Sequence, residues 1–165
     1  MSHALIPGSF DPITLGHLDI IERACAAYDR VSVAVMINES KTYAHSIEER
    51  AEMVRLTVAH LPKVQVITDR GMLVDLFDRI GADVIVKGVR NEKDRAYEAE
   101  MAAYNLSKNP RAKTVLLEAD PALGAVSSTA VREMLANGQR PTELLAPAVL
   151  AYLASRGECP AEEKE

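Results

Sequence analysis

A glycine-containing turn that leads into a histidine is the part of this sequence best suited to chemistry. It reads PGSFDPITLGH over residues 7–17. Gly8 lets the backbone approach a ligand closely, and the Asp-Pro pair builds a rigid turn. Thr14 is a candidate N-cap, so His17 would lie in the first helical turn, where N–H groups and the helix dipole favour an anion. A histidine there can stabilise charge on a phosphoryl group during its transfer. By spacing alone, an ordinary strand–turn–helix junction with a surface histidine is an equally good interpretation.

Basic residues and a hydroxyl cluster follow later strands. Lys41 is a point cation at the end of a strand, although a solvated loop lysine is the simpler interpretation of that position. Lys87 and Arg90 lie on either side of Gly88 and Val89 in KGVR, so two cations stand at the end of another strand. Residues 127–129, Ser-Ser-Thr, offer hydroxyls and N–H groups at the start of a predicted helix. These residue types suit a small ligand that carries phosphate.

The elements that must position these residues alternate between strand and helix. Apolar and β-branched runs predict strands at residues 4–6, 31–37, 64–67, 83–87 and 114–117. Helical spacing of apolar residues predicts helices at 15–27, 46–60, 72–80, 94–107, 128–137 and 147–155. Ser46 and Glu49 form a capping box at the start of the second helix. This order predicts an α/β fold, a doubly wound, mostly parallel five-stranded sheet with helices on both faces, in a Rossmann-like arrangement.

Such a sheet also predicts where the ligand binds. Ligands sit in the crevice beyond the carboxyl ends of the parallel strands. This rule selects four loops, at residues 7–17, 37–41, 87–90 and 117–129.

Composition narrows the class of protein. The 165 residues suit one domain, expected over residues 1–157, with a frayed tail over 158–165. A net charge of -5 and 4% aromatic residues argue against nucleic acid as a partner. No membrane-spanning run or signal peptide is present, and the two cysteines show no pairing pattern, so a soluble, cytoplasmic protein is expected. His3, His45 and His60 have no partner at metal-ligand spacing, and no protein metal site is expected.

Two of these segments carry a family resemblance. Residues 7–17 resemble the first signature of the bacterial phosphopantetheine adenylyltransferases, which belong to the nucleotidyltransferase superfamily with the HxGH motif. Thr14 stands where most of that superfamily has the first histidine, as is characteristic of this branch. The second signature, Ser-Ser-Thr-x-hydrophobic-Arg, is present as SSTAVR at residues 127–132. The resemblance covers about residues 3 to 156.

The resemblance implies a role for each candidate site residue. As catalytic residues it implies His17, which stabilises the transition state, and Lys41, which steers the substrate phosphate. It implies substrate binding by Ser9, Lys41, Leu73 and Lys87. It implies ATP binding by Ser9, Phe10, His17, Gly88, Val89, Arg90, Glu98, Leu123, Gly124, Ala125, Val126, Ser127, Ser128 and Thr129. From periodicity alone Leu73 is equally well a core residue, and Glu98 a solvent-facing helix glutamate. Two residues depart from the family pattern. Many relatives have arginine at the position of Lys87, which keeps the charge but not the bidentate fork, and many have phenylalanine at the position of Arg95.

The implied reaction is transfer of AMP from ATP to 4′-phosphopantetheine, by direct in-line attack without a covalent intermediate. The family also implies Mg²⁺ that accompanies ATP, feedback inhibition by coenzyme A and a homohexamer. One alternative is a related enzyme that acts on nicotinate mononucleotide or uses CTP. The other is a nucleotide-binding protein that has lost turnover. Pyrophosphate release with phosphopantetheine as the acceptor separates the three.

Overall fold

The computed structural model describes residues 1–162 and contains every predicted element. The strands are β1 (His3–Gly8), β2 (Arg30–Met36), β3 (Val64–Asp69), β4 (Val84–Val89) and β5 (Thr114–Glu118). The α-helices are α1 (Leu15–Ala27), α2 (Ile47–Val58), α3 (Leu73–Arg79), α4 (Glu92–Lys108), α5 (Ser128–Ala136) and α6 (Pro147–Ser155), and a 3₁₀ helix, η1 (Pro121–Leu123), was not predicted. Among the helices of residues 1–162, none combines the length and the apolar character that a membrane span requires.

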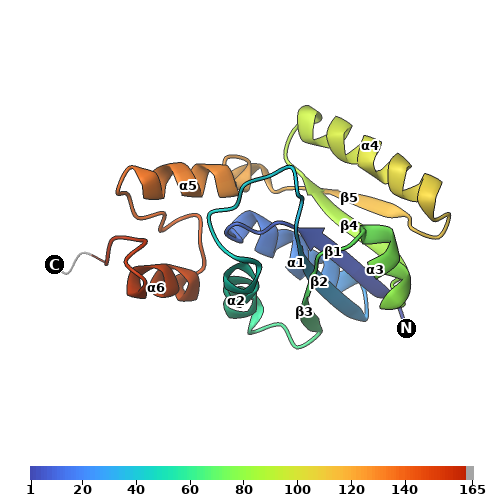
Figure 1. The fold of residues 1–165 in the computed structure, drawn as a ribbon, viewed down its shortest axis with the longest axis horizontal. Helices are drawn as coiled ribbons and strands as arrows, with labels where there is room; N and C mark the ends of the chain where they lie inside the picture. Colours follow the sequence, from blue (N-terminus) through green and yellow to red (C-terminus); the bar gives the residue numbers. More distant parts are fainter. Residues whose placement is uncertain (163–165) are drawn as a thin grey trace.

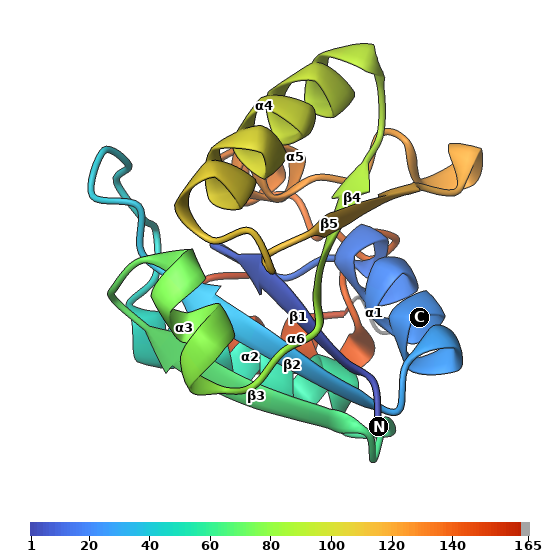
Figure 2. The same ribbon diagram turned by 90° about the vertical axis from the view of Figure 1, so that its right-hand side faces the viewer.

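The five strands form one sheet in the order β3-β2-β1-β4-β5 (Figures 1 and 2). Each neighbouring pair is parallel, so the sheet is wholly rather than mostly parallel. The chain runs outward from β1 through β2 to β3, then returns to the other side of β1 to form β4 and β5. The strand order therefore reverses between β1 and β4, which is where doubly wound sheets bind ligands.

The two faces of the sheet bury separate apolar layers, because successive strand residues point to opposite faces. Ile6 and Val33 belong to the layer covered by α1, α2, α5 and α6. Leu5 and Ile85 belong to the layer covered by α3. The remaining helix, α4, contacts β4, β5 and α3, yet its one buried residue is Asn105. Helices thus cover both faces, as predicted, and α4 keeps most of its surface exposed.

The start of the C-terminal segment packs against the domain more closely than the sequence predicts. Cys159 is only 7% exposed. Glu158 accepts a hydrogen bond from His45, with 2.8 Å between Oε1 and Nε2. The prediction of a frayed tail from residue 158 onward was therefore wrong for these two residues, and residues 163–165 lie outside the described residues.

Candidate active site

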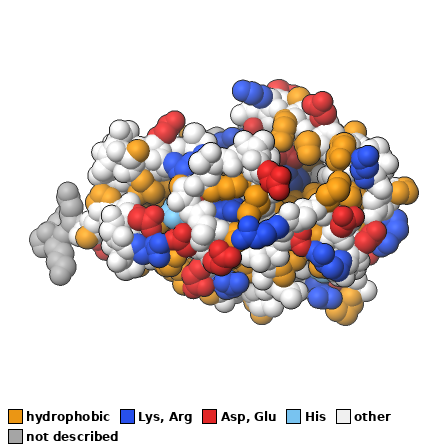
Figure 3. Space-filling model, in the orientation of Figure 1, with side chains coloured by type: hydrophobic (Ala, Val, Ile, Leu, Met, Phe, Trp, Pro, Cys, Tyr) orange, Lys and Arg blue, Asp and Glu red, His pale blue; other side chains and the backbone are white. Residues whose placement is uncertain are grey.

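A cleft of about 1140 Å³ opens at the carboxyl ends of the strands, around the switch point between β1 and β4. All four predicted loops contribute to it, together with one side of α4 and residues 70–73, which connect β3 to the start of α3. Its volume exceeds the usual range of small-molecule pockets, which leaves room for two ligands side by side. Figure 3 shows hydrophobic side chains mixed with Lys and Arg around the hollow of this face.

His17 lines this cleft from the first turn of α1, and Thr14 fixes its tautomer. The backbone N–H of Thr14 donates to Nδ1 of His17 at 2.9 Å, and the Thr14 hydroxyl lies 3.0 Å from the same nitrogen. Since Nδ1 accepts, the proton of the neutral ring is on Nε2. The ring packs edge-on against Phe10, with 5.1 Å between centroids. His17 therefore presents an oriented N–H donor.

The same histidine is uncharged at neutral pH. Burial, followed by the positive charges of Lys87 and Arg90, lowers the pKa of His17 to about 4. A neutral imidazole can donate a hydrogen bond to a phosphate oxygen without adding a formal charge to the site.

The N-terminus of α1 has fewer open N–H groups than a bare helix end. Thr14 is the N-cap, as predicted, and its side chain accepts from the N–H of His17. The N–H of Leu15 donates to the carbonyl of Leu144 at 2.8 Å. Gly16 lines the cleft, and its backbone N–H is the one in the first helical turn that has no hydrogen-bond acceptor within residues 1–162. An anion here would therefore be held by one backbone N–H and the His17 ring.

Residues 127–132, the second signature, hold the turn of the first signature in place through hydrogen bonds. The Ser128 hydroxyl donates to the carbonyl of Pro12 at 2.8 Å, and the Arg132 guanidinium donates to the carbonyl of Asp11 at 2.6 Å. Ser127 caps α5 by accepting from Ala130.

These contacts determine which hydrogen-bond donors of residues 127–129 remain available to a ligand. The hydroxyls of Ser127, Ser128 and Thr129 all have protein partners, since Thr129 Oγ1 accepts from Arg132. The predicted phosphate contact by these hydroxyls therefore competes with internal bonds. The backbone N–H groups at the start of α5 are the donors better placed to serve it.

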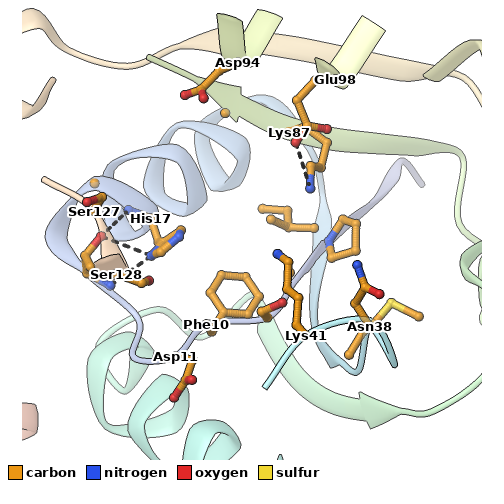
Figure 4. A pocket seen from close by; sticks show the side chains of 18 of the residues that line it. Phe10, Asp11, His17, Asn38, Lys41, Lys87, Asp94, Glu98, Ser127 and Ser128 are labelled. Atoms are coloured by element: carbon orange, nitrogen blue, oxygen red, sulfur yellow. Dashed lines mark hydrogen bonds and ion pairs between the residues drawn. The ribbon is translucent and has the colours of Figure 1, made fainter. Parts of the chain in front are cut away.

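Basic side chains enter the cleft from opposite sides. Figure 4 shows Lys41 and Lys87 pointing into the cavity, one from the loop after β2 and the other from β4. Lys87 Nζ lies 3.4 Å from Glu98 Oε1, and Arg90 Nε lies 3.0 Å from an oxygen of Asp94. Lys41 has no ion pair within residues 1–162 and is the cation best placed to meet an incoming anion.

Sequence reasoning missed the residues that shape the Lys41 loop. The Tyr43 hydroxyl accepts from the backbone N–H of Asn38 at 2.6 Å and so closes the loop around Lys41. Arg50 stacks on the Tyr43 ring, 4.0 Å from its centroid, and donates to the carbonyl of Ser9 at 2.6 Å. Arg50 is only 1% exposed. Its position within the apolar spacing of α2 was the available signal, because a basic residue on a buried face needs partners.

Most of the predicted site residues line the cleft. They are Ser9, Phe10, His17, Lys41, Leu73, Lys87, Gly88, Arg90, Glu98, Leu123, Val126, Ser127, Ser128 and Thr129. Three predicted residues do not line it. The side chain of Val89 is buried in the sheet, and Gly124 and Ala125 are exposed outside the cleft. Their ATP contacts remain predictions.

The donor set of the cleft does not fit a resident metal ion. Within residues 1–162 no group of three His, Cys, Asp or Glu side chains could hold one. Asp94 and Glu98 line the cleft, and each is already paired with a basic group. The Asp11 carboxylate pairs with His45 and is directed away from the cavity. Glu39 is the remaining cleft carboxylate, and it is exposed.

Comparisons with known proteins show the family of this chain. A family model described as cytidylyltransferase-like matches residues 5–134. The phosphopantetheine adenylyltransferase of Limosilactobacillus fermentum is 42% identical over 158 residues, which cover 96% of this chain and 91% of that protein. The protein of the same name from Symbiobacterium thermophilum is 46% identical over 147 residues, or 89% and 90% of the two chains. A solved structure from Vibrio parahaemolyticus, named as a candidate nicotinate-nucleotide adenylyltransferase, superposes with a TM-score of 0.73 at 20% identity over 96% of this chain and 95% of that one. That last likeness shows the fold alone.

Proposed function

The chain belongs to the phosphopantetheine adenylyltransferases, within the cytidylyltransferase-like family, and from this we propose that it transfers AMP from ATP to 4′-phosphopantetheine. The products are dephospho-coenzyme A and pyrophosphate, so the reaction is a step of coenzyme A biosynthesis. The observation that supports it best is a neutral, oriented His17 in the same cleft as Lys41 and Lys87.

In the proposed reaction a phosphate oxygen of phosphopantetheine attacks the α-phosphorus of ATP. A new P–O bond forms as the bond to the bridging oxygen breaks, and pyrophosphate leaves with that electron pair. The nucleophile is already an anion, so no general base has to remove a proton. Catalysis then consists of positioning and charge stabilisation.

The residues divide these tasks. His17 donates from Nε2 to the phosphoryl group as charge builds up on it. Lys41 and Lys87 hold the attacking phosphate, and Ser9 bridges the two substrates. Leu73, half-buried at the edge of the cleft, borders the pantetheine arm. The start of α5 and the segment Gly88–Arg90 border the ATP phosphates and ribose.

We propose that Mg²⁺ accompanies ATP as part of that substrate. The paired carboxylates of the cleft leave its coordination mainly to phosphate oxygens and water. When bound, the ion would neutralise charge on the triphosphate.

Three further proposals concern regulation, assembly and location. Coenzyme A contains the product of the reaction and would compete for the same cleft, as a feedback inhibitor. A homohexamer is supported by exposed apolar side chains of α4 that do not line the cleft, Tyr104 and Leu106, which are 47% and 43% exposed. Use of ATP favours a cytoplasmic location. Light scattering of the purified protein and inhibition by added coenzyme A test the first two.

The test of the main proposal is pyrophosphate release from ATP. Release with phosphopantetheine, and none with nicotinate mononucleotide or with CTP in place of ATP, is the expected result. Release with nicotinate mononucleotide alone would assign the chain to the other substrate. Tight ATP binding without release with either acceptor would favour a protein that binds nucleotide without turnover.

A further inference from the structure

His45 is a buried histidine that the proposed reaction does not use. Its Nδ1 lies 2.9 Å from Asp11 Oδ1, and its Nε2 lies 2.8 Å from Glu158 Oε1. The side chains of His45 and Asp11 are each 4% exposed, and that of Glu158 is 34% exposed. A neutral imidazole has a single N–H, so both bonds to carboxylates form together only when the ring carries both protons. This geometry is that of an imidazolium between two carboxylates.

These bonds join three segments that are distant in sequence. Asp11 follows Phe10, which packs on His17 in the cleft. Figure 4 shows the Asp11 side chain directed away from the cavity. Its second oxygen accepts from the backbone N–H of Ala44 at 2.7 Å, so the loop that carries Lys41 is tied to the same carboxylate. The third segment is the C-terminal one, through Glu158.

Charged groups from each neighbouring element surround this histidine. Glu49 of α2 pairs with Arg156, whose Nε donates to the other oxygen of Glu158 at 2.8 Å. Arg50 of α2 donates to the carbonyl of His45, and Arg132 of α5 donates to the carbonyl of Asp11. The arginines contact Glu158 or backbone carbonyls, and the His45 ring itself faces carboxylates.

These contacts determine the ionisation of His45 and Asp11. The hydrogen bond to Asp11 raises the pKa of His45, opposed by burial and supported by Glu158. Burial acts to raise the pKa of Asp11, but hydrogen bonds from His45 and Ala44 outweigh it, so the pKa is held below its usual value. The stabilisation from His45 is therefore present below its unfolded pKa and is lost as pH rises through the folded pKa.

We propose that His45 is a positioning residue of the active site, which as an imidazolium locks the Phe10–Pro12 turn and the Lys41 loop to the segment around Glu158. Loss of one proton breaks one of its two carboxylate bonds and loosens the turn against which His17 packs. The inference rests on the proposed function, because its effect is read in the transfer reaction.

The test is the pH profile of kcat/KM for phosphopantetheine in wild type, Glu158→Gln and the control Glu162→Gln. Glu162 is an exposed carboxylate of the same segment and makes no ion pair within residues 1–162. Ionisations of the substrates are common to all three proteins and cancel in the ratio of variant to wild type. We expect Glu158→Gln to match wild type within about twofold at the acidic end of the profile, where the imidazolium can donate to either side chain. At the alkaline end it should be about three- to tenfold faster than wild type, because the introduced amide can donate to Nε2 of the neutral ring whereas the Glu158 carboxylate cannot. Glu162→Gln should match wild type throughout.

A second variant keeps the outcome unambiguous. His45→Gln can donate one amide hydrogen bond to Asp11 but does not titrate, so it should be slower than wild type at low pH and its ratio to wild type should rise with pH. Coincident profiles for Glu158→Gln and wild type would overturn the positioning role. If wild type releases no pyrophosphate at any pH, the proposed function fails by itself. The role of His45 is then judged by whether the affinity for ATP, measured by calorimetry over the same pH range, weakens less with rising pH in Glu158→Gln than in wild type.

Discussion

Replacement of His17 by alanine tests whether this residue acts as a neutral hydrogen-bond donor. Removal of a preorganised donor from a developing phosphoryl charge should lower kcat by about 10²- to 10³-fold. The affinity for ATP should change by no more than about threefold, because the contact is strongest in the transition state. Stopped-flow or steady-state measurement of pyrophosphate release, with calorimetry for ATP binding, gives both numbers.

The control for this variant is His17→Gln. Alanine also removes the acceptor for the N–H of Thr14, which costs about 1 kcal/mol of capping stability. Glutamine at the third helical position can still accept that bond, as in an ordinary capping box. A loss of kcat shared by both variants shows that the reaction needs the imidazole itself. A loss seen only with alanine shows that an amide can replace the imidazole, because glutamine keeps both the acceptor for Thr14 and an N–H donor. Turnover of His17→Ala within about threefold of wild type would refute the donor role.

The pKa of His17 gives the free-energy cost of protonating this residue in the folded protein. A pKa of about 4 rather than 6.5 corresponds to about 3 kcal/mol against protonation of the folded state. Near pH 7 about one molecule in a thousand carries the charged ring, so kcat should not require a protonated His17. The unfolded chain takes up this proton near pH 6.5 and the folded chain near 4, so wild type loses stability as pH falls through that window. His17→Gln should lack this loss, which denaturant unfolding at several pH values measures.

Three other substitutions test the rest of the cleft. Glu98→Gln should raise the KM for ATP by about tenfold if Glu98 contacts the nucleotide, and an unchanged KM in steady-state kinetics would leave it only as the partner of Lys87. Lys41→Met should lower kcat/KM for phosphopantetheine by about ten- to a hundredfold without lowering the melting temperature, because Lys41 is exposed; a drop in melting temperature would contradict this. Gly88→Ala should destabilise the fold by about 1–3 kcal/mol in denaturant unfolding, since a Cβ there would lie 2.8 Å from Ile20 Cγ1, and a variant as stable as wild type would show that Ile20 can move aside.

The sequence predicted the sheet and its helices well because their signals are local. Apolar strand runs and helical spacing report burial within a few residues, and the caps at Thr14 and Ser46 are formed within one turn. The candidate cleft followed from topology, since parallel strands bring their carboxyl ends to one edge. The partners of Arg50 and His45 could not be predicted in this way. His45 reaches Glu158 across 113 residues, and no periodicity encodes such a contact.

Long-range contacts also explain why the hydroxyls at the start of α5 differ from the prediction made for them. Hydroxyls at a helix N-terminus suggested direct phosphate ligands, and that expectation considered only the helix. In the folded chain Ser128 donates to Pro12, a residue 116 positions earlier. Tertiary contacts therefore decide which donors remain available to a ligand, and sequence patterns identify only the candidates.

The bracing of the first signature by the second also bears on the order in which the protein folds. Ser128 and Arg132 reach back to residues 116 and 121 positions earlier, so these bonds close very long loops and carry a large entropic cost. The strands β1, β2 and β3 with α1 and α2 are synthesised and can associate first, while the turn at Asp11 and Pro12 still lacks its supports. We therefore expect a chain that has formed only its first three strands to have an unfinished catalytic loop, because both supports come from α5.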